Sequence, residues 1–172
     1  MLFLETKKTD LIIVINDLTA EGCPILALDL IDECYKNHIT PLIIRFFSHN
    51  NELLNEFKNK GVNVISFDLE SSGIFRYFKI VYLTYITCRK YRPKSLLSFS
   101  FGWHSFLAIG SKLSGVKNIC AHAGNVITKK RNLSFFKFLI VVQIGRPFTK
   151  NIICCSKTVR ESILKNLSLK KN

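Results

Sequence analysis

The chain alternates short, nearly continuous apolar runs with longer stretches of helical periodicity, and this alternation restricts its fold more than any other feature. The runs are rich in β-branched residues, and continuous hydrophobicity is typical of strands that are covered on both faces. They occupy residues 11–15, 42–47, 62–67, 95–101, 116–121 and 151–155. Six such runs separated by helices predict an α/β fold: a doubly wound, mostly parallel, Rossmann-like sheet of about six strands with helices on both faces.

Helical patterns fill the intervals between these runs. They cover residues 24–36, 51–59, the stretch from Gly73 towards Pro93, 103–113, 133–145 and the segment that follows Ser156. Pro24 suits the first position of the first helix, and Thr158 with Glu161 has capping-box spacing at the start of the last one. Since 48% of the 172 residues are hydrophobic, we expect residues 1–172 to form a single domain around one core.

The formal net charge of +13 is concentrated in two segments, 74–94 and 129–150, which contain many aromatic residues and no acidic one. On a helical wheel Arg76, Lys79 and Lys90 share one narrow stripe, which we expect to contact an anionic membrane surface. An ordinary core helix with a solvated stripe is the alternative. No run of about 18 uncharged apolar residues is present, so no spanning helix is predicted, and no motif beside the charge indicates nucleic acid.

In parallel α/β sheets, ligands bind beyond the carboxyl ends of the strands, where the strand order reverses. Function is therefore expected in the loops after Ile15, Phe101 and Ala121. The first of these loops, NDLTAEGCP, contains neither G-x-G-x-x-G nor a P-loop. Gly22 and Cys23 are small and stand at a helix N-terminus, which favours negative charge, so a ligand can approach the backbone there. A plain strand-to-helix turn is the alternative.

The other two loops carry candidate ligand-binding side chains. In SFSFGWHSF, Trp103 offers an aromatic face to a sugar ring or a lipid head, and His104 offers a hydrogen-bonding group, although a lone Trp is also typical of a core. In CAHAGN, His122 and Asn125 leave an apolar strand, where a structural histidine is the alternative.

Several chemistries lack the residues that they need. No His, Cys or carboxylate cluster has metal-ligand spacing, so no metal is expected, and G-x-S-x-G is absent, which disfavours Ser-His-Asp catalysis. The six cysteines form no regular framework, and the first residues do not resemble a secretory signal. A reducing, cytoplasmic compartment is the expectation.

Five motifs, in order, resemble the N-terminal domain of family 4 glycosyltransferases of the GT-B fold. EGCPILALDLIDECYKNHITPLII resembles their glycine loop, first helix and second strand, and NKGVNVISFD resembles their third strand. RKYRPKSLLSFS is similar to the segment that leads into their fourth strand. AIGSKLSGVKNICAHAGN and NIICCSKTVRESI are similar to two later motifs. The resemblance extends over nearly the whole chain from Asp10 onward.

The resemblance implies a function and a set of roles. Family 4 enzymes transfer a sugar from a nucleotide-sugar donor with retained anomeric configuration, in a cleft between two Rossmann-like domains, the first of which mainly holds the acceptor. By resemblance, Gly22 and Cys23 approach the donor diphosphate, His122 faces the transferred sugar and is the catalytic candidate, and Ser156 caps the last helix. No metal or other cofactor is implied, because the nucleotide-sugar is itself a substrate.

The chain departs from the family at the end of the fourth strand, where SFSFGWHS replaces a histidine-bearing motif. Either Ser98, Ser100 or His104 takes the acceptor role there, or that role is lost. The expected acceptor-binding residues are Ser100, Trp103, His104 and Asn125. The family's second domain, which supplies the nucleotide pocket, is not recognised after Asn172. We therefore expect this chain alone to transfer no sugar at a useful rate, since electrostatic stabilisation is usually the largest catalytic term.

Two functions remain open from the sequence. The first is the acceptor-binding half of a retaining glycosyltransferase that extends a lipid-linked saccharide in cell-surface polysaccharide synthesis, with a nucleotide-sugar donor held by a missing or separate domain. Such a protein would be cytoplasmic and peripheral on the inner face of the cell membrane. The second is a non-catalytic α/β module that docks on an anionic membrane or a partner protein.

Overall fold

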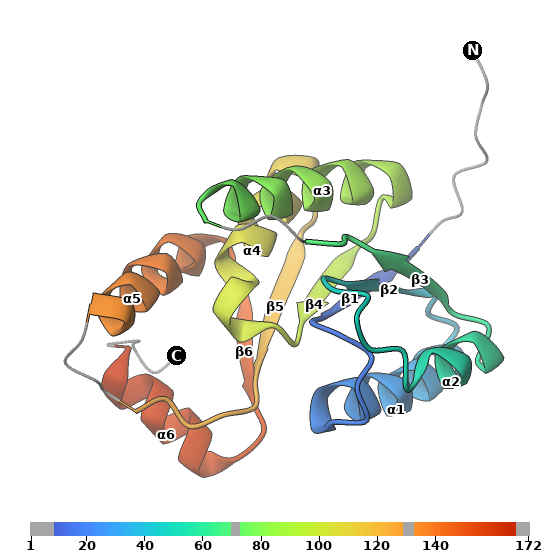
Figure 1. Ribbon diagram of the computed structural model, residues 1–172, viewed down its shortest axis with the longest axis horizontal. Helices are drawn as coiled ribbons and strands as arrows, with labels where there is room; N and C mark the ends of the chain where they lie inside the picture. The colour runs from blue at the N-terminus through green and yellow to red at the C-terminus, as the bar shows by residue number, and fades with distance from the viewer. Residues whose placement is uncertain (1–8, 70–72, 129–132, 168–172) are drawn as a thin grey trace.

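The chain forms a twisted sheet of six strands, all parallel, in the order β3-β2-β1-β4-β5-β6 (Figure 1). The structure, a computed structural model, describes residues 9–69, 73–128 and 133–167. The strands are β1 (Leu11–Ile15), β2 (Pro41–Arg45), β3 (Asn63–Ser66), β4 (Ser95–Ser98), β5 (Asn118–Ala123) and β6 (Asn151–Cys154). The doubly wound parallel sheet predicted from the apolar runs is confirmed.

Helices cover both faces of this sheet (Figure 1). They are α1 (Gly22–Lys36), α2 (Leu54–Asn59), α3 (Phe75–Tyr91), α4 (His104–Ser114), α5 (Leu133–Gly145) and α6 (Lys157–Asn166). Alternate residues of β1 point to opposite sides, as the period of a strand requires. Ile13 and Ile15 belong to a core cluster with residues of α1 and α2, whereas Ile12 and Val14 pack with residues of α3 and α4. A third cluster joins α5, α6 and the end of β5.

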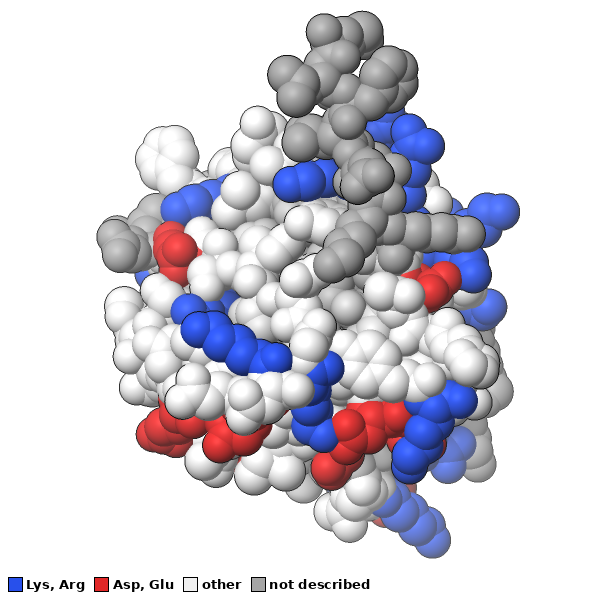
Figure 2. All heavy atoms as spheres, turned by 90° about the vertical axis from the view of Figure 1, so that its right-hand side faces the viewer, with Lys and Arg blue, Asp and Glu red and all other residues white. Residues whose placement is uncertain are grey.

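The two helical layers differ in charge. The acidic residues of the helices in the described chain lie mainly in α1 and α2, whereas α3, α4 and α5 contain none. Figure 2 shows the face at the right of Figure 1, where acidic side chains gather in the lower part, on the side of α1 and α2. The layer formed by α3, α4 and α5 is therefore the cationic one. Lys129, Lys130 and Arg131 of the second basic segment lie outside the described residues.

The ends of some elements differ from the sequence prediction. Helix α1 begins at Gly22, so Pro24 is its third residue and not its first. Helix α6 is capped by Ser156, whose hydroxyl accepts a hydrogen bond from the Val159 amide at 3.2 Å. The capping box expected at Thr158 is therefore wrong, because Thr158 already lies inside the helix, and the cap implied by the family resemblance is confirmed.

The fully buried residues of α3 include no aromatic ring. The sequence predicted a basic stripe at the surface of this helix, and the residues that the structure buries are Ile80, Thr84, Thr87 and Cys88. The exposed large side chains of this helix and its preceding residue are Ile74, Phe75, Tyr77, Phe78, Tyr82, Tyr85 and Ile86.

Close contact with α4 explains this choice of face. A Cβ at Gly110 of α4 would lie 2.5 Å from the Val81 carbonyl oxygen and 3.0 Å from the Thr84 Cβ, and Cys88 Sγ lies 3.9 Å from Ser111 Oγ. Two helix backbones this close leave room only for small side chains between them, so Phe75, Phe78 and Tyr82 of α3 are turned outward. None of the helices in the described ranges is long and apolar enough to cross a membrane.

Candidate functional site

A cleft of about 960 Å³ lies at the carboxyl ends of β1, β4 and β5, where the strand order reverses. This is where the doubly wound topology places ligands. The three loops singled out in the sequence meet there, and the cleft brings together six of the seven residues expected to act at the site. They are Gly22, Cys23, Ser100, Trp103, His122 and Asn125.

The loop between β1 and α1 leaves open space in front of the helix N-terminus. Helix α1 begins without a side-chain cap, so the first-turn amides have no capping side chain. Gly22 does not have a positive φ, and a Cβ built on it would meet no atom within 4 Å. Gly102 on the opposite wall shows the same openness. The described fold therefore places no steric demand for glycine at these positions, and both leave open space beside the cleft.

His122 is held in the wall of the cleft by β5 and by an aromatic neighbour. The residue is 7% exposed, and its ring centroid lies 4.8 Å from that of Phe99. A Cβ on Gly124 would lie 3.6 Å from His122 Cε1 and 3.9 Å from Cys23 Sγ, so the imidazole and the Cys23 thiol flank the same glycine. Burial lowers the pKa of His122, which keeps the ring neutral at neutral pH.

Two polar side chains of the cleft have no hydrogen-bond partner among the described residues. Ser100, just after β4, is 2% exposed, and its hydroxyl is unpartnered, although its amide donates to Ser98 Oγ at 3.2 Å. His122 Nδ1 is likewise buried and unpartnered. Because buried polar atoms are nearly always hydrogen-bonded, a ligand hydroxyl or a water molecule would satisfy both groups.

Trp103 lines the cleft but also belongs to the core. Its ring lies edge-on to Phe46, with centroids 6.2 Å apart, and 5.7 Å from the ring of Tyr77. The Arg76 guanidinium lies between the rings of Phe47 and Trp103, at 5.9 and 5.8 Å from their centroids. Trp103 is therefore both a core residue and a cleft residue, because it is half-buried, packs against the core and lines the cleft.

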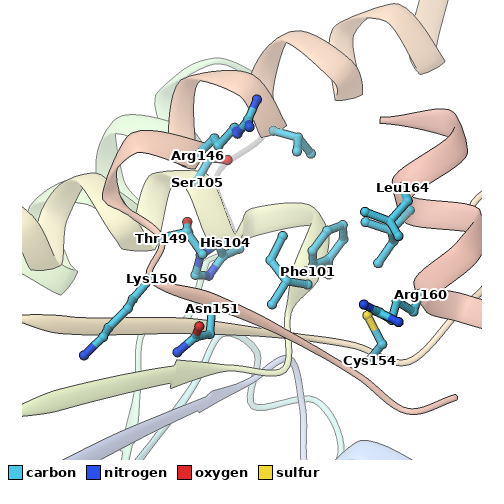
Figure 3. A pocket seen from close by; sticks show the side chains of 13 residues that line it. Phe101, His104, Ser105, Arg146, Thr149, Lys150, Asn151, Cys154, Arg160 and Leu164 are labelled. Carbon is cyan, nitrogen blue, oxygen red and sulfur yellow. The ribbon is translucent and has the colours of Figure 1, made fainter. Parts of the chain in front are cut away.

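His104 lies outside this cleft, in the wall of a second cavity of about 260 Å³ between α4, α5, β6 and α6 (Figure 3). Its Nε2 lies 2.8 Å from Thr149 Oγ1. Because the Thr149 hydroxyl donates its only hydrogen to the Gly145 carbonyl at 2.9 Å, Nε2 must be the donor. Burial lowers the pKa of His104 to about 4. The structure therefore separates His104 from the other expected acceptor-binding residues.

The predicted membrane stripe is dispersed. Arg76 is half-buried between two rings, and Lys79 Nζ donates to the Asp68 carbonyl at 3.0 Å. Lys90 is exposed, with its Nζ 5.3 Å from the Tyr91 ring centroid. The three cations therefore do not present one uninterrupted stripe to solvent.

Several cleft residues were not identified from the sequence. Asp17 and Glu21 come from the same loop as Gly22, Phe47 follows β2, and Cys155 follows β6. The Cys155 thiol donates to the Gly124 carbonyl at 3.1 Å. A signal existed for the first two, since both are polar residues in a loop at the carboxyl end of a strand. No group of three or more metal-ligating side chains occurs in the part of the chain that the structure describes.

The architecture matches solved glycosyltransferases of the GT-B fold. HepE from Anabaena, crystallised with UDP and glucose, aligns with 92% of this chain at a TM-score of 0.69 and 12% identity. A glycosyltransferase from Rickettsia africae aligns with 95% at 0.69 and 17% identity, and the apo lipopolysaccharide outer core galactosyltransferase WaaB aligns with 94% at 0.64 and 12% identity. No protein-family model and no curated protein matches the sequence.

The aligned regions cover 41% of HepE, 41% of the Rickettsia enzyme and 43% of WaaB. The chain therefore spans about two fifths of the length of these solved structures. It has the fold of one half of a GT-B glycosyltransferase, consistent with the N-terminal half expected from the sequence.

Proposed function

We propose that this chain is the acceptor-binding half of a retaining glycosyltransferase, which moves a sugar from a nucleotide-sugar donor to a saccharide. The observation that carries the proposal is the cleft at the reversal of strand order, where six residues expected at the site meet on a half-GT-B fold. HepE, which shares this fold, binds UDP and glucose. The open space at Gly22 gives a donor diphosphate room to approach the uncapped amides of α1.

The charge of the cleft supports dependence on a second domain. No Lys or Arg among the described residues lines the cleft, and His122 is neutral. A leaving nucleoside diphosphate develops negative charge in the transition state, and that charge needs fixed positive groups or hydrogen-bond donors. We propose that a second α/β domain supplies the basic groups and the nucleotide pocket. The neutral His122 imidazole, on this side, would face the transferred sugar.

The proposal is tested on the chain alone with nucleotide sugars and a panel of saccharides. We expect no transfer, because the diphosphate lacks a positive partner, but we expect saccharides to shift the amide signals of Gly22, Ser100 and His122. Transfer by the chain alone would contradict the need for a donor domain. Saccharides that leave all three signals unchanged would contradict the acceptor role.

We also propose contact with a membrane surface. The contact is made by exposed apolar side chains and not by the basic stripe predicted from the sequence. Phe75, Phe78 and Tyr82 of α3 are 75%, 66% and 62% exposed, and they recur at helical spacing on one face. Helix α5 exposes a comparable apolar series: Leu133, Phe136, Ile140 and Ile144. Both helices contact α4, on the layer that carries basic and no acidic helix residues.

Exposed aromatic and aliphatic side chains beside cations are typical of interfacial helices that bind anionic lipid. We propose that these two helices hold the protein at the inner face of the cell membrane, with exposed Lys90 and Lys137 near the headgroups. A lipid-linked saccharide at that surface would then be the acceptor. Such an acceptor suits cell-surface polysaccharide synthesis in the cytoplasm.

Co-sedimentation with phosphatidylglycerol vesicles tests the membrane contact. We expect binding to these vesicles, weaker binding to phosphatidylcholine vesicles, and a loss of about tenfold for Phe78→Ser combined with Tyr82→Ser. Ile25→Ser with Tyr35→Ser is the matched control, because both residues are exposed on α1 in the other helical layer. Equal loss in both double variants, or no vesicle binding at all, would refute the contact.

The exposed faces of α3 and α5 also favour a second candidate, a non-catalytic module that docks on a membrane. Saccharide binding separates the two functions. A docking module has no reason to keep two buried polar groups unpartnered in a cleft, whereas an acceptor-binding half does. Vesicle binding without any saccharide effect on the cleft would favour the docking module.

A further inference from the structure

The cleft has an unusual charge for this protein. The chain carries 25 Lys and Arg against 12 Asp and Glu, yet among the residues that the structure describes the only charged side chains that line the cleft are Asp17 and Glu21. Neither carboxylate forms an ion pair with a described residue. A third carboxylate contacts the same loop, because the Ala20 amide donates to Glu52 Oε2 at 2.7 Å. The described lining of the cleft is therefore anionic, although the protein as a whole is cationic.

The other polar groups of the cleft do not offset this charge. Among the described lining residues only His122 could do so by protonation, but burial lowers its pKa and keeps it neutral. Asn16 and Asn125 contribute amides, and Ser100 contributes a hydroxyl. All three bind hydroxyl groups well and carry no charge.

Two observations besides the carboxylates indicate a ligand with hydroxyl groups. The Ser100 hydroxyl and His122 Nδ1 belong to side chains that are 2% and 7% exposed, both line the cleft, and neither polar atom has a partner in the described chain. Aromatic side chains, Phe47 and Trp103 among them, complete the wall and suit the apolar faces of a sugar ring. Hydroxyls that donate to Asp17 or Glu21 would form charge-assisted hydrogen bonds.

We propose that the sugar unit bound in the cleft is uncharged, and that Asp17 and Glu21 determine this specificity by excluding units that bear a carboxylate or a phosphate. This inference rests on the proposed function and specifies its acceptor class. An acidic unit would lie beside two like charges, between aromatic walls that lower the local dielectric, and no Lys or Arg is among the described residues that line the cleft. The donor diphosphate differs, because in the proposed enzyme its positive partners come from the donor domain.

The experiment uses pairs of saccharides that differ in one substituent. Each pair consists of a glucose, galactose or mannose oligosaccharide and its counterpart with uronic acid units. Binding is followed by the amide signals of Gly22, Ser100 and His122, so acidic saccharides that adhere to the basic outer surface are not counted. We expect the neutral member of a pair to bind about tenfold or more tightly than its uronate counterpart. The double variant Asp17→Asn, Glu21→Gln should reduce that ratio to about threefold or less.

The substitutions are chosen to preserve the fold. Asp17 Oδ1 accepts a hydrogen bond from the Leu18 amide at 2.7 Å, and an asparagine oxygen can accept the same bond. Asp29→Asn with Glu56→Gln is the matched control, since it changes the net charge equally at exposed positions outside the cleft. We expect this control to keep the wild-type preference for neutral units.

Each outcome bears on a different proposal. Uronates that bind the cleft as tightly as neutral units, or a preference that the double variant leaves unchanged, would overturn the exclusion by Asp17 and Glu21. The acceptor role would survive that result. If no saccharide of either kind moves the cleft signals, the proposed function itself fails, and the specificity fails with it.

Discussion

Acidification should weaken this fold through the buried side chain of His104. Burial lowers the pKa of His104 from the ordinary value of 6.5 to about 4 in the folded protein. A depressed histidine pKa means that the folded state prefers the neutral ring, so the contribution to stability is complete above pH 6.5 and is lost as the pH falls towards 4. The difference between the two pKa values corresponds to about 3 kcal/mol. That is a large part of the typical stability of a domain.

The geometry around His104 explains why protonation is costly. Nε2 already donates to Thr149, and the proton would be added at Nδ1, which is buried and has no acceptor among the described residues. Arg146, Lys150 and Arg160 also line the cavity, and no carboxylate is among its described lining residues (Figure 3). A protonated ring would therefore have neither a hydrogen-bond partner nor a counter-ion.

Urea unfolding of the wild type and of His104→Gln at pH 7 and pH 5 measures this contribution. The glutamine amide can donate to Thr149 but does not titrate in this range. We expect the wild type to lose about 2 kcal/mol more than the variant between the two pH values. His122 and the carboxylates are present in both proteins, so their effects cancel in the difference. Equal losses in the two proteins would refute the assignment to His104.

Three further predictions concern packing, capping and the cleft. Gly110→Ala should destabilise the protein by about 1–3 kcal/mol in thermal unfolding, because its Cβ would lie 2.5 Å from the Val81 carbonyl; unchanged stability would contradict the close approach of α3 and α4. Ser156→Ala should cost about 1 kcal/mol in urea unfolding through loss of the helix cap, and Ser156→Asp should retain most of it. Cys23→Leu should lower sugar transfer by a reconstituted two-domain enzyme about tenfold or more while the chain still folds, since the side chain borders the open cleft. Full activity of this variant would indicate that the turn has only a structural role.

The sheet was predictable because strands buried on both faces must be apolar at successive positions. Residues 12–15 of β1 and all of β2 are buried, as their uninterrupted runs indicated. The position of the cleft followed from the same reasoning, since the reversal of strand order is a property of the topology and not of any one side chain. Strand ends were less predictable: β4 ends at Ser98, and the apolar residues beyond it turn into a 3-10 helix at Phe101–Trp103.

The orientation of α3 was not predictable from hydrophobic periodicity. Its aromatic and aliphatic residues occur nearly all round the helix, so a helical wheel indicates no single buried face. The close approach of α4 at Gly110 determines which face of α3 is buried. It leaves room for Thr84, Thr87 and Cys88 but not for larger and more hydrophobic rings. That contact pairs residues far apart in the sequence, which no local pattern reveals.

Neighbouring residues can also be separated by the fold. Trp103 ends the 3-10 turn and His104 begins α4, so the two side chains diverge, one towards the cleft and the other into the second cavity. Conversely, Asp17 and Glu21 line the same cleft as His122 although they lie far from it in the sequence. The sequence therefore identified the loops of the site more reliably than it identified every side chain that lines the site.

The most direct test of the central claim is a nuclear magnetic resonance titration of this chain with saccharides, in which every assigned amide is followed. If the chain is an acceptor-binding half, the shifts will be concentrated at the carboxyl ends of β1, β4 and β5, at Gly22, Cys23, Ser100, His122 and Asn125. Saccharide shifts centred on the His104 cavity, or none at all, would contradict the claim.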